Sequence, residues 1–348
     1  MFDGHNDTLV EFFNHKSKPK EFGEEQTFSD LDFVRCQKGD FGGGLFGIFT
    51  SPPRDSPESA SGYGLTITDT GYTMTMQSAQ DPEYVQQFTH TIINYAQDIE
   101  NALSGKVKII KTYHDLTDAR KRNLIAMVLH IEGADCIDIN LDNLQKFYDE
   151  GVRSLGVVWS RPNIFGCGVP FVFPGSPNTG DGLTSDGKRL VKVCNEMGVM
   201  VDLAHINEKG FWDVARTSNK PLVVSYAGVH ALCQSTRNLT DAQLDEVGKS
   251  EGVVGIIFEP LNTRPDGKHD DDTPLTVIVD HIRYVAERIG IDHVALGSDF
   301  DGAQTPKQLK CVADLPNLMD ELQTSGFSNE EIENIAYKNW FRVLKQTW

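Results

Sequence analysis

The sequence has no long hydrophobic run. No apolar segment approaches the roughly 20 residues that a membrane-spanning helix needs, and the chain opens on Phe2-Asp3-Gly4 without a basic-then-apolar leader. We therefore expect no membrane segment and a cytoplasmic location.

Positive charge and paired cysteines are also scarce. The 32 basic residues face 50 acidic ones, so the net charge of −18 gives no electrostatic footprint for binding phosphate backbones. We expect no nucleic-acid partner. The six cysteines are scattered without C-x-x-C spacing, which is typical of reduced, structural thiols.

What is present describes an ordinary globular protein. Of the 348 residues, 39% are hydrophobic and 24% are charged. This length suits two average domains or one large α/β barrel, since such barrels run from about 200 to over 400 residues. With no internal repeat and no clear boundary, we interpret residues 1–348 as a single domain.

Apolar, β-branched segments recur along the chain, and most are followed by a helical pattern. Strands that alternate with helices favour a parallel sheet, and eight such units favour a closed (β/α)8 TIM barrel. The eight predicted strands are Met1–Asp7, Gly44–Thr50, Leu124–Glu132, Val152–Trp159, Val199–His205, Leu222–Ala227, Val253–Glu259 and His293–Asp299.

The predicted helices carry capping signals. Ser185 is expected to cap a helix that runs toward Met197 and stops at Gly198. The apolar stripe of residues 273–289 predicts a helix packed on the barrel exterior. Capping boxes are expected at Thr240 with Gln243 and at Ser328 with Glu331.

Three stretches are expected to be long loops: Ser51–Gly71, Arg161–Gly182 and Asn262–Asp272. The first two follow predicted strands at the C-terminal face, where the active sites of such barrels are built. Loops of this length often act as lids or substrate walls. The acidic run Asp270-Asp271-Asp272 is expected to be a solvated loop.

His5 and Asp7 form the first candidate for a metal site. Positions i and i+2 of a strand project to the same face, so the two side chains would lie side by side. Zinc binds histidine nitrogen and carboxylate oxygen together. A His-x-Asp match is common by chance, so the pair needs other ligands to support it.

The ends of the predicted strands supply such groups. Several buried polar groups converging at one barrel mouth are costly without a shared partner, and a metal is the simplest such partner. The residues concerned are His5, Asp7, Glu132, Trp159, His205, Tyr226 and Asp299.

The order of these residues resembles the membrane (renal) dipeptidase family, peptidase family M19, of the metal-dependent amidohydrolase superfamily. The resemblance covers nearly the whole chain. It rests on the strings Asp3-Gly4-His5-Asn6-Asp7, Gly42-Gly43-Gly44, His130-Ile131-Glu132-Gly133, Gly151-Val152-Arg153, Val201-Asp202-Leu203-Ala204-His205, Ser225-Tyr226, Thr236-Arg237-Asn238-Leu239-Thr240 and Gly297-Ser298-Asp299-Phe300-Asp301-Gly302.

The resemblance implies a two-zinc hydrolase. His5 and Asp7 would bind one zinc, Glu132 would bridge to a second, and His205 would bind the second. In such enzymes two ions about 3.5–4 Å apart share a hydroxide that attacks a polarised carbonyl. The implied reaction is hydrolysis of dipeptides, including those with a C-terminal D-residue, and relatives of this kind often form homodimers.

Three further roles follow from the same resemblance. Asp299 matches the catalytic aspartate, which takes a proton from the hydroxide and passes it to the leaving amine. Arg237 matches the arginine that grips the substrate's terminal carboxylate. Trp159 stands where mammalian members have a substrate-contacting histidine, and we expect it to shape the pocket.

Tyr226 departs from the family pattern, which places a ligand of the second zinc there as Ser-His. A phenol must lose a proton with a reference pKa of ~10, which would cost about 4 kcal/mol at neutral pH. Tyr226 could ligate as a phenolate, donate a hydrogen bond to the transition state or fill the gap. His230 could substitute, but a strand end does not naturally return position i+4 to the same point.

Three hypotheses follow from this departure. The leading one is a zinc-dependent dipeptidase with an intact first metal site and a weakened second one. The second is a one-metal amidohydrolase that acts on another amide or a lactone. The third is a barrel that keeps the fold but is catalytically impaired.

Overall fold

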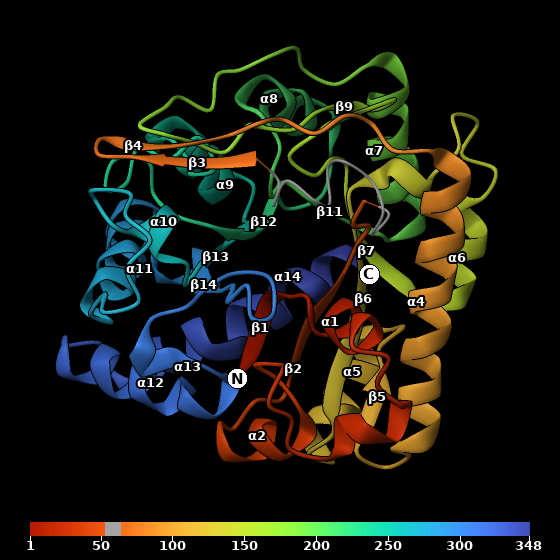
Figure 1. The fold of residues 1–348 in the computed structure, drawn as a ribbon, viewed down its shortest axis with the longest axis horizontal. Coiled ribbons are helices and arrows are strands. Elements are labelled where there is room, and N and C mark those ends of the chain that lie inside the picture. The colour runs from red at the N-terminus through yellow and green to blue at the C-terminus, as the bar shows by residue number, and fades with distance from the viewer. Residues whose placement is uncertain (53–63) are drawn as a thin grey trace.

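The computed structural model describes residues 1–52 and 64–348. In this part of the chain, eight parallel strands form a nearly closed barrel, with helices outside it (Figure 1). The (β/α)8 prediction is confirmed. The barrel strands are β1 (Phe2–Asn6), β2 (Gly43–Phe49), β6 (Ile125–Glu132), β7 (Val152–Gly156), β11 (Met200–Asp202), β12 (Val223–Ala227), β13 (Val253–Ile256) and β14 (Val294–Leu296).

The strands follow one another around the barrel in chain order. Closure occurs where residues just beyond β14 meet β1. The Asp299 amide donates to the His5 carbonyl at 3.0 Å, and the Asp7 amide donates to the Phe300 carbonyl at 2.9 Å. The seam of the barrel therefore joins the first candidate ligands to the candidate catalytic aspartate.

Helices surround the strands on the outside of the barrel (Figure 1). No helix in residues 1–52 and 64–348 is long and apolar enough to cross a membrane. The helices are α1 (Thr8–Asn14), α2 (Phe33–Lys38), α4 (Pro82–Ala102), α5 (Tyr113–Lys121), α6 (Leu144–Glu150), α7 (Ser185–Met197), α8 (Glu208–Thr217), α9 (Asp241–Lys249), α10 (Pro260–Thr263), α11 (Thr276–Ile289), α12 (Leu315–Thr324), α13 (Asn329–Glu333) and α14 (Asn339–Thr347).

The capping predictions are confirmed with one correction. Thr184, not Ser185, caps α7, because its side chain accepts the Gly187 amide; the helix ends at the left-handed Gly198 as expected. The capping boxes at the starts of α9 and α13 are present. The apolar stripe of α11 is buried, although the helix begins at Thr276 rather than Thr273.

The predicted long loops contain short strands. β3 (Leu65–Thr68) lies inside the expected loop Ser51–Gly71, whose residues 53–63 lie outside the described part of the chain. It pairs with β4 (Gly71–Met74), which pairs with β10 (Val172–Phe173) from the second expected loop. The two segments therefore form one small antiparallel sheet, which sequence spacing alone did not reveal.

Other short elements were also missed. β8 (Pro162–Asn163) and β9 (Gly166–Cys167) pair within the second loop. β5 (Val107–Ile109) pairs with the first residues of β6, outside the eight predicted strands. The one-turn helix α10 begins at Pro260 and extends over the first two residues of the third expected loop.

Helix α14 closes the N-terminal end of the barrel. Its Trp340 is fully buried and donates its indole N–H to the Leu296 carbonyl at 3.0 Å. Trp340, Val343 and Leu344 pack in one cluster with side chains from seven strands: Phe2, Leu45, Ala126, Val128, Met200, Val223, Val253 and Ala295. The barrel interior is filled at this end, so the opposite end is left for chemistry.

Three glycines on β1, β13 and next to β14 make room for one backbone carbonyl of β12. A Cβ at Gly4, Gly255 or Gly297 would lie 2.1, 2.0 or 2.2 Å from the Ser225 carbonyl oxygen. Because these positions carry no side chain, β12 approaches β1 closely. The residue after Ser225 is Tyr226, whose ring then stacks on His5 with centroids 4.1 Å apart.

Gly4→Ala tests this close approach. The new Cβ would also lie 2.6 Å from Trp340 and 2.9 Å from the Leu296 carbonyl, so we expect the free energy of unfolding to fall by about 3 kcal/mol or more. Gly156→Ala in β7 is the matched control, because its Cβ would meet no atom closer than 3.5 Å and should cost less than about 1.5 kcal/mol. Equal losses in urea unfolding would contradict the packing argument.

Candidate active site

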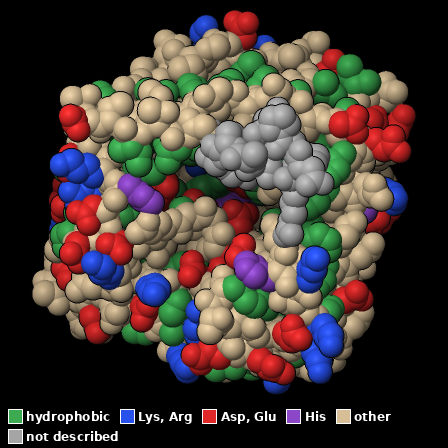
Figure 2. All heavy atoms as spheres, in the orientation of Figure 1, with side chains coloured by type: hydrophobic (Ala, Val, Ile, Leu, Met, Phe, Trp, Pro, Cys, Tyr) green, Lys and Arg blue, Asp and Glu red, His purple; other side chains and the backbone are tan. Residues whose placement is uncertain are grey.

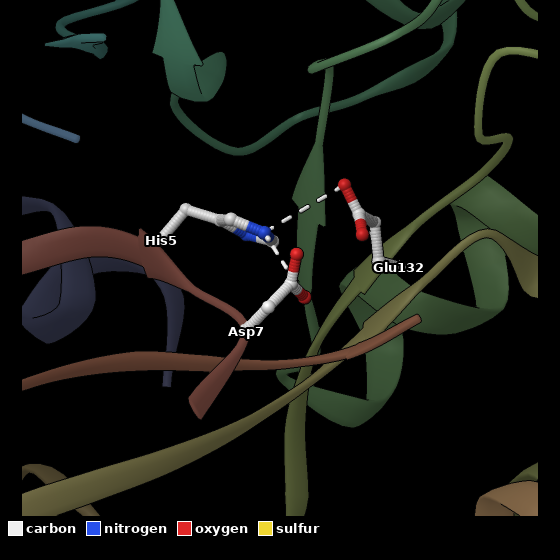
Figure 3. A group of neighbouring side chains, drawn as sticks. All are labelled: His5, Asp7 and Glu132. Carbon is white, nitrogen blue, oxygen red and sulfur yellow. Dashed lines mark ion pairs between the residues drawn. The ribbon is translucent and has the colours of Figure 1, made fainter. Parts of the chain in front are cut away.

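His5, Asp7 and Glu132 converge at the C-terminal end of the barrel. His5 lies on β1, Asp7 directly follows that strand, and Glu132 ends β6 (Figure 3). His5 Nε2 lies 3.7 Å from Asp7 Oδ1 and 3.7 Å from Glu132 Oε1. One ligand atom from each residue lies within 4.8 Å of the others, so the three could hold a metal ion together.

The chemistry of these residues fits a metal such as zinc. Both ring nitrogens of His5 and the Oδ1 atom of Asp7 are buried, and no hydrogen-bond partner is found for them among the described residues. Buried polar atoms without partners are costly. Imidazole nitrogen with carboxylate oxygen is a donor set that zinc prefers.

The electrostatics of the group also favour a cation. Burial alone would lower the pKa of His5, but the Glu132 and Asp7 carboxylates outweigh burial and raise this pKa to about 10. Burial raises the pKa of the Glu132 carboxyl to about 7. The protonated His5 imidazole therefore balances the charge of the neighbouring carboxylates. A bound cation would take over this role.

The second half of the expected site has a different arrangement. His205 follows β11, and its Nε2 lies 3.0 Å from Glu132 Oε1. The Tyr226 hydroxyl donates a hydrogen bond to the same Glu132 oxygen and also contacts His205 Nε2. His205 therefore lies directly beside both Glu132 and Tyr226, outside the three-residue group.

His205 is held from its other side as well. Its Nδ1 contacts the Ser160 hydroxyl at 2.7 Å, and the Arg237 guanidinium lies 3.3 Å from its Nε2. Burial and the nearby Arg237 charge lower the pKa of His205 well below its usual value. The imidazole is therefore neutral and hydrogen-bonded.

His230 is not close to this group. Its Nε2 contacts the Gly175 carbonyl at 2.7 Å, and it is absent from the residues that line the cavity. The expectation that position i+4 would not return to the strand end agrees with this placement.

Asp299 and Arg237 also face the group. Asp299 Oδ1 lies 3.9 Å from His5 Nε2, and burial raises the pKa of Asp299 well above its usual value. Arg237 lies over the Tyr226 ring at 4.9 Å. Its Nε is buried without a hydrogen-bond partner, and it forms no ion pair with a described carboxylate.

Trp159 forms part of the wall. Its ring lies 5.5 Å from that of His205, 4.7 Å from that of Phe49 and 5.8 Å from that of Phe171. It therefore lines the cavity beside His205.

Two of these residues have unusual backbone conformations. His205 has a φ of 64° and Asp299 a φ of 62°. Non-glycine residues seldom adopt positive φ, and such strain clusters at functional sites. The chain turns sharply just beyond β11 and β14, which directs both side chains toward Glu132 and His5.

A cavity of about 350 Å³ opens onto these residues, and Figure 2 shows a hollow with acidic side chains at this face. Its apolar wall includes Tyr72, Phe171 and Leu261. Its charged lining comprises Asp7, Glu11, Glu132, Arg237, Glu259, Asp299 and Asp301. Sequence reasoning missed Glu259 and Asp301, although each stands at or just beyond the end of a predicted strand.

A buried polar network supports the site from below. His130 Nδ1 contacts the Ser154 hydroxyl at 2.8 Å, and its Nε2 lies 3.5 Å from Asp202. Asp202 accepts hydrogen bonds from the Ser225 amide and hydroxyl. The signal in the sequence was the i, i+2 spacing of His130 and Glu132, which places both on one face of β6.

Metal binding should stabilise the protein. Zn²⁺ at a hundredfold excess over its Kd should add about 2.7 kcal/mol to the free energy of unfolding of chelator-treated protein. Asp7→Asn, which keeps the shape but loses the charge, should remove most of this gain. Glu11→Gln is the matched control, because Glu11 lines the same cavity outside the three-residue group. Thermal melts that zinc does not shift would contradict the assignment.

The chain matches known proteins over its whole length. A family model described as membrane dipeptidase (peptidase family M19) matches residues 1–348. A metallo peptidase from Rhodobacter sphaeroides, solved with a phosphinate mimic of the dipeptide L-Ala-D-Ala, has a TM-score of 0.95 and 36% identity; the match covers 100% of this chain and 99% of that one.

Two relatives also match most of this chain in sequence. An uncharacterized protein in the pqqA 5' region of Klebsiella pneumoniae is 46% identical over 70% of this chain and 90% of its own length. Dipeptidase aclJ of Aspergillus oryzae is 28% identical over 99% of this chain and 77% of its own length.

Proposed function

This chain belongs to the membrane dipeptidase family, peptidase family M19, and we propose that it hydrolyses the peptide bond of dipeptides with zinc as its metal. Members of this family are metallo-dipeptidases, so the chain is a hydrolase of this class. The observation that carries the proposal is the convergence of His5, Asp7 and Glu132 within 4.8 Å, where Asp7 and Glu132 line a cavity of about 350 Å³. A cavity of this size suits a small molecule.

His5, Asp7 and Glu132 would hold the ion. A zinc ion bound there would lower the pKa of a water molecule to near 7 and polarise the scissile carbonyl. The protein's own part is to place these donors on strand ends and to bury them, which strengthens electrostatic interactions with the substrate.

Arg237 would bind the C-terminal carboxylate of the substrate. Its guanidinium faces the cavity with a buried Nε that has no partner among the described residues. A planar guanidinium suits bidentate binding of a carboxylate. This contact would fix the dipeptide's second residue and set the length of substrate that fits.

Asp299 would move the proton. Its carboxyl lines the cavity next to His5, and burial raises its pKa well above the usual value. A carboxylate with a raised pKa is a stronger base, so Asp299 would take a proton from the attacking water and then donate it to the leaving amine. The hydrolysis then yields two free amino acids.

Turnover of dipeptides by the purified, zinc-supplemented protein tests the proposal. The panel should include dipeptides with a C-terminal D-residue, because the Rhodobacter sphaeroides relative was solved with a mimic of L-Ala-D-Ala. Absence of turnover together with absence of bound metal would overturn it.

Arg237→Ala tests the substrate's orientation. Losing a charged hydrogen bond in a desolvated site costs about 3 kcal/mol, so kcat/KM for a dipeptide should fall roughly 100-fold. The matched substrate is the corresponding dipeptide amide, which lacks the carboxylate and should react equally with both proteins. Equal losses on the two substrates would place Arg237 in another role.

The position of Tyr226 favours a dipeptidase that binds one metal ion instead of two. Its hydroxyl contacts both Glu132 and His205, the two groups that the family resemblance assigns to the second zinc. Burial raises the pKa of Tyr226 well above its usual value, so the phenol keeps its proton. We infer that the hydroxyl fills the second metal position and remains a hydrogen-bond donor.

Tyr226→His should restore a second ion. We expect elemental analysis to give about one zinc per wild-type chain and about two per variant chain, because a neutral imidazole binds zinc without first losing a proton. Tyr226→Phe is the matched control and should stay at about one. Two tightly bound ions in the wild type would contradict this inference.

A further inference from the structure

We propose that Glu259 makes this enzyme selective for dipeptides with a basic side chain, such as that of lysine; this rests on the proposed dipeptidase function. Glu259 lines the same cavity as Asp299 and Arg237. It stands three residues beyond the end of β13. In the barrel, β13 lies between β12, which contains Tyr226, and β14, which precedes Asp299.

Glu259 has no cationic partner among the described residues. The one contact found for its carboxyl there is a hydrogen bond that the Asn262 amide donates to Oε2. No described lysine, arginine or histidine forms an ion pair with it. Glu11, by contrast, lines the same cavity and lies 3.2 Å from His15.

The Glu259 carboxyl is held in place. Asn262 Oδ1 accepts a hydrogen bond from the Ser235 hydroxyl at 2.7 Å, which directs the Asn262 amide N–H group toward Glu259. The Tyr72 hydroxyl contacts Ser235 at 2.9 Å and donates to the Leu261 carbonyl at 3.3 Å. A fixed carboxyl loses little entropy when it binds a ligand, so this arrangement suits recognition.

The proposed chemistry assigns no cation to the Glu259 carboxyl. Burial raises its pKa to about 7, with the Asn262 hydrogen bond and the Arg237 charge acting the other way. Arg237 is already assigned to the substrate's carboxylate, and a metal ion held by His5, Asp7 and Glu132 would balance that group. A ligand's ammonium or guanidinium group would be the missing partner.

The surrounding wall fits the stem of a long basic side chain. Leu65, Tyr72, Met74 and Leu261 line the cavity together with Glu259. Lysine and arginine bury their methylene stems against apolar surface and direct the charge to a polar group. The apolar side chains of the cavity that Glu259 lines therefore match such a side chain.

The substrate's α-ammonium is a poorer match. In a dipeptide this nitrogen lies about 2.5 Å from the scissile carbonyl carbon, so it stays beside the metal group. The acidic residue that faces this group is Asp299, 3.9 Å from His5 Nε2. Glu259 is outside the three-residue metal group, and its carboxyl is hydrogen-bonded to Asn262.

Paired substrates test the proposal. Norleucine has the stem of lysine without the ammonium, so Ala-Lys is compared with Ala-norleucine, and Lys-Ala with norleucine-Ala. We expect the wild type to favour the lysine member of at least one pair by about tenfold to 100-fold in kcat/KM. Whichever pair shows the preference identifies the residue of the substrate that Glu259 recognises.

Glu259→Gln should reduce that preference to less than about threefold, since the amide keeps the shape and loses the charge. Glu11→Gln, which removes a charge from the same cavity, should keep the preference. A ratio near one in the wild type, or a ratio unchanged in Glu259→Gln, would overturn the proposal. An equal loss on both members of a pair would assign Glu259 to the α-ammonium and also overturn it.

Hydrolysis of the norleucine dipeptides separates this proposal from the proposed function. If these are cleaved but no lysine preference exists, only the role of Glu259 fails. If no dipeptide is cleaved, the dipeptidase function fails. Calorimetry then measures the binding of Ala-Lys and Ala-norleucine to the wild type and to Glu259→Gln, which makes the same comparison without turnover.

Discussion

The site depends on one buried carboxylate oxygen, Oε1 of Glu132. It lies 3.7 Å from the imidazole of His5 and 3.0 Å from that of His205, and it accepts the hydroxyl of Tyr226. A buried carboxylate needs compensating charge or several donors. Two imidazoles and one phenol surround this atom, and the proposed metal ion would be held beside it.

The barrel satisfies this requirement by geometry. Parallel strands bring their C-terminal ends to one mouth, so residues far apart in sequence meet around Glu132. The sharp, positive-φ turns at His205 and Asp299 direct two side chains inward, and the glycines around the Ser225 carbonyl bring Tyr226 against His5. α14 fills the opposite end of the barrel, which leaves one open mouth.

Sequence patterns predicted much of this. Eight strands with helices between them follow from hydrophobic periodicity, and the candidate residues at the strand ends then had to converge. Pairing between distant loops has no such periodic signal, so the sheet of β3, β4 and β10 was missed. Ser185 was predicted to cap α7 in place of Thr184 because serine and threonine both cap helices well, and the two residues are adjacent. Glu259 was missed because its environment depends on Asn262 and Tyr72, which only the tertiary fold brings together.

The charged residues that line the cavity connect the number of bound metal ions to the choice of substrate. Six carboxyls line it against one arginine, and hydrogen bonds from Thr8 and Ser29 stabilise one of the six, Asp301. Two divalent ions would neutralise most of the rest, whereas one ion leaves a negative excess. Tyr226 adds no charge while it keeps its proton. A cavity with one ion and a neutral Tyr226 would therefore suit a cationic substrate, and Glu259 is the carboxyl that we propose to bind it.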